Sequence, residues 1–252
     1  MHYQRTFLTK VILRFDFAEI PALRGDMRPD FSGRIEDIYP VVASQPIASV
    51  TMTLGPENSS VQQQNVGRLW QHRKTTEGTK LVSLAPTFLS VEYGTNDYDH
   101  FPTFRGEIER VFAEFNNIYH IAEMSRVGLR YINEISFPQG NALDWNNLLR
   151  PDLIASAKCG LLDGMQMVRS VHQLQTTAEG HTILLHYGFF NPDYPNPLVR
   201  RHFVLDYDAF RSEATPSADV LARVNQMNEL CERMFEWSIE QGLREQMGII
   251  ND

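Results

Sequence analysis

A short pattern of alternating residues occurs twice in this chain, and it constrains the fold more than any other feature. The central copy is VGLRY, Val127–Tyr131, and the N-terminal copy is VILRF, Val11–Phe15. Alternation with a period of two is typical of a half-buried β-strand. A second pair of matching stretches, Phe88–Tyr93 and His202–Tyr207, lies at nearly the same separation. The sequence therefore predicts an internal duplication.

The order of predicted elements supports two repeats, residues 1–123 and 124–252. Each repeat reads as a strand, a short helical stretch, several strands and a helix, and Gly55–Asn65 reads as a polar loop. We predict an α+β fold in which a curved sheet carries helices on one face, with a topology like that of the TATA-binding-protein-like or ferredoxin-like folds. The predicted elements in chain order are strand 10–17, a broken helix 20–39, strands 47–54, 68–74, 80–84 and 88–93, a helix from 99, strand 124–137, a helical stretch 145–157, strands 166–176, 181–190 and 201–207, and a final helix 217–247.

Composition narrows the function classes. The net charge of −8 argues against non-specific binding to nucleic acid or to anionic membranes, because positive charge drives both. Cys159 and Cys231 have no Cys or His neighbour at zinc-ligand spacing, so we expect neither a disulfide framework nor a structural metal. No apolar run approaches the length of a membrane span. We expect a cytoplasmic protein without a cofactor.

The charges are distributed unevenly. The predicted helical regions 17–40, 98–120 and 216–252 together carry the whole −8, whereas the strand regions 1–16, 68–80 and 124–137 are net positive. If helices cover one face of the sheet, the other face is basic and suits an acidic or anionic partner. The alternative is that these arginines pair with acids such as Asp16 and Glu134. The predicted binding residues are Lys10, Arg14, Arg68, Arg73, Lys74, Arg126, Gly128 and Arg130.

Two of these predictions are specific. Arg14 and Arg130 occupy matched positions in the two motifs, so alternation sends both side chains away from the helices and makes them the centre of the surface. Gly128 weakens its strand unless something needs the space, so we expect another chain segment or a ligand to lie close over it.

No catalytic motif of a known class occurs, and the remaining candidates are weak. His172 and His186 lie on predicted strands, as does His72, and with arginines they suggest metal-independent phosphodiester cleavage. Glu107 and Glu109 point in different directions around a helix and are expected to be solvated. Asp206 and Asp208 at a strand end favour a cap or loop role over cation binding.

The loop FFNPDYPNP, Phe189–Pro197, holds three prolines between two predicted strands. A proline-stiffened loop loses little entropy on binding, which favours recognition, and a rigid connection is the alternative.

With these motifs, the chain resembles an uncharacterised, sporadically distributed family of bacterial and archaeal proteins of similar length. The resemblance is carried by VILRFDF, RLWQHR, YDHFPTF, the central Arg-x-Gly-Leu-Arg-Tyr-x-Asn and MFEWSI, although the proline-rich approach to the first strand is missing. It implies no activity and no catalytic residues. The patchy distribution of the family implies accessory genes, such as defence or toxin–antitoxin systems.

We therefore expect a non-enzymatic binding module that recognises a protein partner, or an RNA or DNA segment, within a larger complex. A metal-independent nuclease or another phosphodiester-acting enzyme is the alternative. The sequence does not indicate an oligomeric state.

Overall fold

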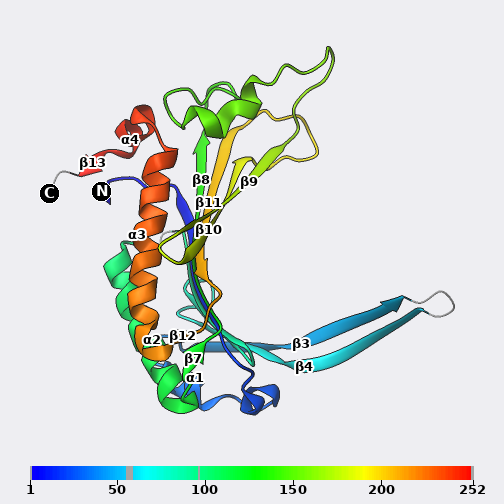
Figure 1. Ribbon diagram of the computed structural model, residues 1–252, viewed down its shortest axis with the longest axis vertical. Coiled ribbons are helices and arrows are strands. Elements are labelled where there is room, and N and C mark those ends of the chain that lie inside the picture. Colours follow the sequence, from blue (N-terminus) through cyan, green and yellow to red (C-terminus); the bar gives the residue numbers. More distant parts are fainter. Residues whose placement is uncertain (1, 55–58, 96, 251–252) are drawn as a thin grey trace. The chain divides into compact units, whose positions relative to one another are not determined.

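The computed structural model describes residues 2–54, 59–95 and 97–250, and its elements form an α+β fold (Figure 1). In this described part of the chain, nine strands form one antiparallel sheet in the order β3-β4-β5-β6-β2-β8-β11-β10-β9. The sheet strands are β2 (Leu8–Asp16), β3 (Val41–Leu54), β4 (Ser59–Arg73), β5 (Leu81–Ala85), β6 (Phe88–Gly94), β8 (Arg126–Phe137), β9 (Ser170–Ala178), β10 (His181–Phe189) and β11 (Arg201–Arg211).

The helices and the short strands complete the element order. The helices are α1 (Asp30–Arg34), α2 (Phe101–Tyr119), α3 (Val220–Ser238) and α4 (Gln241–Met247), with 3-10 helices η1 (Pro21–Arg24), η2 (Pro151–Lys158) and η3 (Ser217–Asp219). Two small sheets pair β1 (His2–Tyr3) with β13 (Ile249–Ile250), and β7 (Glu123–Met124) with β12 (Thr215–Pro216). Among the described residues, no helix combines the length and the apolar character that crossing a bilayer requires.

The chain divides into two compact units that interleave in sequence. One comprises residues 1–11, 128–211 and 224–252, and we call it the C-unit; the other comprises residues 12–127 and 212–223, and we call it the N-unit. Strands β2 and β8 and helix α3 each begin in one unit and end in the other. The division at 127/128 lies close to the predicted start of the second repeat, whereas the first eleven residues belong with the later part of the chain.

In the N-unit, α2 supplies the apolar stripe that its sequence predicts. Phe104, Ile108, Val111, Phe112 and Phe115 are buried on one side of the helix. Phe112 packs on Phe15 of β2 with ring centroids 5.1 Å apart, and Phe104 packs edge-on against Tyr93 of β6 at 4.8 Å. The residues of β2 and β6 that point to the same side as Phe15 and Tyr93 therefore face α2.

In the C-unit, α3 covers one face of the sheet. The Tyr131 hydroxyl of β8 donates to Asn228 Oδ1 at 2.7 Å, and Tyr207 of β11 meets Phe235 edge-on at 6.4 Å. Side chains alternate across a strand, so Arg130 and Asp206, the neighbours of these tyrosines, lie on the opposite, helix-free face. Trp145, which is fully buried, closes the end of this core against Phe203.

Several sequence predictions differ from the structure. Residues 59–65 were expected in a loop but form β4, paired residue by residue with β3 from Ala48↔Asn65 to Leu54↔Ser59; residues 55–58 of that expected loop lie outside the described residues. The helix expected over 20–39 is reduced to η1 and α1, and the stretch expected to be helical from Trp145 starts only at Pro151.

The final helix is also broken. α3 ends at Ser238 and α4 begins at Gln241, because Ile239 leaves the helix to form a β-bridge with Leu149. The Glu240 amide donates to the Leu148 carbonyl at 2.9 Å. These long-range backbone bonds replace the helical ones at the break.

Candidate functional site

A row of polar side chains crosses four strands on the helix-free face of the C-unit. Gln173 of β9, His186 of β10, Asp206 of β11 and Arg130 of β8 follow one another across the sheet. The register places His186 directly opposite both Gln173 and Asp206, which puts the three side chains on one face. We call these four residues the polar row.

Asp206 is the anchor of the polar row. Its side chain is only 9% exposed, and it accepts hydrogen bonds from Arg130 Nε at 2.7 Å and from Nη2 at 2.6 Å. These bonds raise the pKa of the Arg130 guanidinium. The Arg130 side chain is nevertheless 41% exposed, so the fork is fixed on one side and open to a partner on the other.

His186 completes the row on the other side of Asp206. Its Nδ1 lies 3.8 Å from Asp206 Oδ2, and its Nε2 lies 3.1 Å from Gln173 Oε1. The His186 side chain is one third exposed. The row therefore presents an arginine and a histidine on either side of one carboxylate.

The other histidine candidates do not join this site. His172 stacks on Tyr187 with ring centroids 5.2 Å apart and contacts Ser170 Oγ at 2.8 Å. It alternates with Gln173 along β9, so it points to the opposite face of the sheet from His186.

His72 is buried inside the N-unit rather than at a surface. Its Nε2 lies 2.8 Å from Ser32 Oγ and its Nδ1 lies 3.3 Å from the Val82 carbonyl. Burial lowers the pKa of His72 to about 4. A neutral, enclosed imidazole of this kind packs within the core.

The predicted basic residues fall in both units. Lys10, Gly128 and Arg130 belong to the C-unit, whereas Arg14, Arg68, Arg73, Lys74 and Arg126 belong to the N-unit. Arg14 and Arg130 thus lie in different units, and the expectation that they form the centre of one surface stays a prediction.

In the N-unit, Asp16 gathers two of the predicted arginines. Arg14 donates from Nε at 2.9 Å and from Nη2 at 2.6 Å to Asp16 Oδ1, and Arg126 Nη1 lies 3.8 Å from Oδ2. The Arg14 guanidinium also lies over the Phe88 ring, 4.0 Å from its centroid. The pairing with Asp16 that the sequence left open is thus observed, with Arg14 still 43% exposed.

Arg68 has a similar arrangement on β4. Its Nη1 donates to Asp26 Oδ1 at 2.8 Å, and its Nε and Nη2 donate to Ser44 Oγ. Arg73 and Lys74 lie at the end of β4, where Arg73 pairs with Leu81 of β5.

Gly128 is buried, and the segment or ligand expected over it stays a prediction.

Glu107 differs from the sequence expectation that it is solvated. It accepts a hydrogen bond from the Tyr39 hydroxyl, and Lys80 Nζ lies 3.7 Å from its carboxylate and 4.1 Å from the Tyr93 ring centroid. Burial, with Glu107 close by, raises the pKa of Tyr39. Glu109 is exposed and pairs with Arg105 one turn earlier, as a surface residue does.

No group of three or more His, Cys, Asp or Glu side chains that could hold a metal ion occurs within residues 2–54, 59–95 and 97–250.

The expected role of Asp206 in a cap or loop is wrong, because Asp206 lies within β11 rather than at its end. Its carboxylate accepts a hydrogen bond from Arg130 instead. Cys159 is exposed, and Cys231 is buried, which raises the pKa of its thiol.

Comparison with known proteins gives no match: no family model, no curated protein and no solved structure matches this chain.

Proposed function

We propose that this chain is a non-enzymatic binding module that recognises a partner protein through the helix-free face of its sheet, as part of a larger complex. The observation that carries the proposal is the fork between Arg130 and Asp206. A guanidinium has five N–H groups, and two of them are used by Asp206. The others are pre-oriented on a side chain that is 41% exposed, so a partner carboxylate or carbonyl meets a fixed donor.

Charge pairing favours a protein over a nucleic acid as this partner. Arg14, Arg68 and Arg130 each lie beside a carboxylate, and the chain carries −8 overall. Binding to a phosphate backbone depends on unpaired cations that release its counterions. The nucleic-acid alternative consequently has little support from the arrangement of these arginines.

Internal duplication is part of the proposal. Outward from the centre of the sheet, the N-unit strands run β2-β6-β5-β4-β3, and those of the C-unit run β8-β11-β10-β9. In each series the first strand in sequence is innermost, and the strand that precedes the long helix is its neighbour. This order supports two related repeats of the TATA-binding-protein-like or ferredoxin-like kind, and the family resemblance adds a role in a defence or other accessory system.

The proposal is tested by site-specific photo-crosslinking in cells of the native host. A photoreactive phenylalanine analogue replaces Gln173, which is exposed on β9 within the polar row, or Glu229, which is exposed on α3 of the same unit. We expect a defined protein adduct from position 173 and not from 229. Adducts that nuclease treatment removes, or equal adducts at both positions, would count against the proposal.

One observation favours a second candidate, a metal-independent phosphodiesterase: His186 lies between Asp206 and Gln173, where a carboxylate orients an imidazole for proton transfer. The test is cleavage of labelled single-stranded RNA and DNA in the presence of EDTA. Activity of this site requires His186 and is indifferent to His172, which lies on the other face. Cleavage that survives His186→Ala excludes this site.

A further inference from the structure

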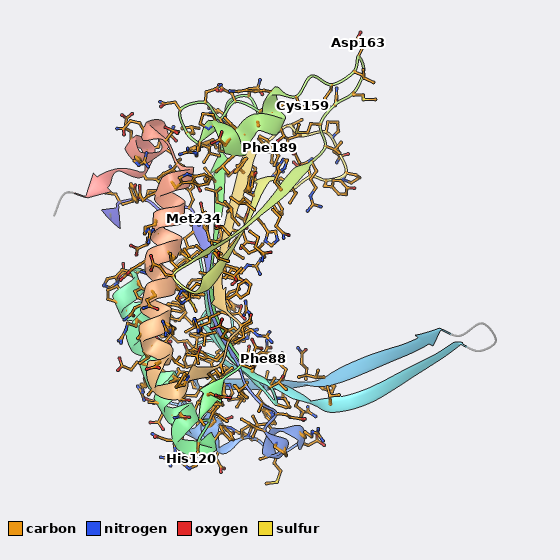
Figure 2. The ribbon with its side chains drawn as sticks, viewed as in Figure 1. Phe88, His120, Cys159, Asp163, Phe189 and Met234 are labelled. Carbon is orange, nitrogen blue, oxygen red and sulfur yellow. The ribbon has the colours of Figure 1, made fainter. Side chains whose placement is uncertain are left out.

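Two loops of the C-unit lie side by side and expose apolar side chains. One joins η2 to β9 and the other joins β10 to β11; the Leu198 amide donates to the Met167 carbonyl at 2.9 Å. Asp163 lies near the outer end of the first loop (Figure 2). The apolar side chains that are more than a third exposed on these loops and at the adjoining start of β9, which we call the loop patch, are Leu161, Leu162, Met165, Val168, Val171, Tyr194 and Val199.

The loop patch is held in place by a buried asparagine. Asn191 is 4% exposed, and its amide nitrogen donates to the Val168 carbonyl at 2.9 Å and to the Asn196 carbonyl at 2.7 Å. Its carbonyl oxygen accepts from the Asp193 amide at 3.0 Å. These bonds tie the second loop to the first. The apolar side chains are thus presented on a braced surface, and clustered exposed apolar groups mark interaction sites.

The loop patch leads directly into an open strand edge. β9 is the last strand of the sheet, and within the described part of the chain its outer edge pairs with no other strand. β9, SVHQLQTTA, contains no proline, lysine, arginine or acidic residue, and most of its side chains are exposed. Natural edge strands usually carry such protecting residues, so an unprotected edge is a template for another strand.

The charge at this place is opposite to that of the whole chain. Residues 158–171 and 189–201 contain four basic and two acidic side chains, whereas the chain carries −8. The Arg169 guanidinium lies over the rings of Phe190 and Tyr194, 5.4 and 5.8 Å from their centroids. Among the described residues, no carboxylate forms an ion pair with Arg169. The loop patch therefore offers an aromatic-backed cation beside apolar groups.

We propose that an extended segment of a partner protein, with alternating apolar side chains and at least one carboxylate, adds to the edge of β9 and packs on the loop patch. The inference rests on the proposed function in requiring a partner protein, but it assigns the contact to the outer edge of β9 and the loop patch, which adjoin the polar row at Gln173 of the same strand. A second copy of this chain is a poorer occupant, because its own β9 is uncharged and supplies no carboxylate for Arg169.

The test uses a displayed library of random peptides, about as long as β9, selected on the full chain. Enriched peptides should carry acidic residues among alternating apolar ones. Arg169→Glu should weaken the binding of the enriched peptides by about tenfold or more, as expected for an interfacial charge pair. Arg5→Glu is the matched control, since Arg5 is also exposed and lies over an aromatic ring, 5.2 Å from the Phe7 centroid.

A second measurement tests strand addition itself. Backbone N-methylation of an enriched peptide at every second residue should abolish binding in one phase and spare it in the other, because only alternate amides face β9. No enrichment, or equal binding by Arg169→Glu and wild type, would overturn the inference. Peptides that respond to Arg130→Gln and not to Arg169→Glu would overturn it while leaving the proposed function intact.

Discussion

Arg130 and Asp206 form a two-pronged ion pair between the neighbouring strands β8 and β11, in which Nε and Nη2 each donate to a different carboxylate oxygen. Arg14 occupies the matched position of β2, yet both of its donors reach one oxygen of Asp16 in its own strand. The repeated motif thus keeps the arginine and changes the acid. The two arginines consequently differ in what their removal leaves behind.

The first prediction compares Arg130→Gln with Arg14→Gln. The Asp206 side chain is only 9% exposed, so in Arg130→Gln water replaces the lost guanidinium poorly as a partner of its carboxylate. We expect this variant to lose about 1–2 kcal/mol of unfolding free energy, a range that is kept low because Arg130 itself is 41% exposed. Asp16 is 21% exposed and keeps Arg126 at 3.8 Å, so Arg14→Gln should cost less than about 1 kcal/mol. Urea denaturation of both variants measures the difference.

Asp206→Asn in the Arg130→Gln background provides the control. Removing the stranded charge should restore part of the lost stability, giving a favourable coupling in the double-mutant cycle. Strictly additive losses would mean that the ion pair contributes nothing beyond its separate side chains.

The second prediction concerns Glu107. Glu107→Gln leaves Lys80, whose side chain is 14% exposed, without its carboxylate, and it weakens the hydrogen bond from Tyr39. We expect a loss of about 1–3 kcal/mol in chemical denaturation. Glu109→Gln, two residues away on α2 and 55% exposed, should change stability by no more than about 0.5 kcal/mol. Equal losses would show that Glu107 is merely a surface residue.

The sequence predicted well those elements that bury one face. β2, β8 and α2 follow from their apolar spacing, because Val11, Leu13 and Phe15 alternate and Phe104 and Ile108 recur one helical turn apart. Residues 59–65 were missed because SSVQQQN has no apolar alternation; only pairing with β3 identifies them as a strand. The break in the final helix at Ile239 was missed because the bridge that causes it joins Ile239 to Leu149, which is far away in the sequence.

The candidate site shows the same division. Alternation alone places Arg130 on the helix-free face, and Asp206 follows from its buried neighbours Leu205 and Tyr207. Their meeting requires β8 to lie beside β11, together with a register that no local pattern encodes. Glu107 illustrates the converse, because a helix pattern gives its direction but not the tyrosine and lysine that enclose it.

The third prediction is a loss of stability in mild acid that depends on His72. Its pKa is about 4 in the folded chain, against an ordinary 6.5, because burial disfavours the charged ring. As pH falls from 6.5 towards 4, the unfolded chain takes up a proton that the folded chain refuses, so stability falls in this window by up to about 3 kcal/mol. Above pH 6.5 His72 is neutral in both the folded and the unfolded chain, so its full contribution to stability is present.

The measurement is urea denaturation at several pH values for wild type and His72→Gln. The variant loses stability at neutral pH, because the bond to Ser32 and the fit of the ring are disturbed. Its stability should nevertheless decline less steeply than that of wild type between pH 6.5 and 4. Parallel pH profiles would assign the acid sensitivity to other groups.

The last prediction concerns Gly188, which β10 uses to approach β9. Its φ is +138°, and a Cβ built at this position would lie 2.1 Å from the Ser170 carbonyl oxygen and 3.2 Å from Val171 Cα. These are backbone atoms of the neighbouring strand, so no side-chain rotation relieves the clash, and the φ is one that an L side chain rarely adopts. Gly188→Ala should therefore cost at least about 2 kcal/mol and separate the first residues of β9 from β10. Amide exchange should accelerate around Ser170 and Val171, while α2 in the other unit keeps its protection.

Gly106→Ala on α2 is the matched control, since nothing lies within 4 Å of its added Cβ, and a helix interior gains about 0.5–1 kcal/mol from this change. A Gly188→Ala variant as stable as wild type would mean that β9 is not held against β10 at this point, and the strand edge offered to a partner would then be wrongly placed.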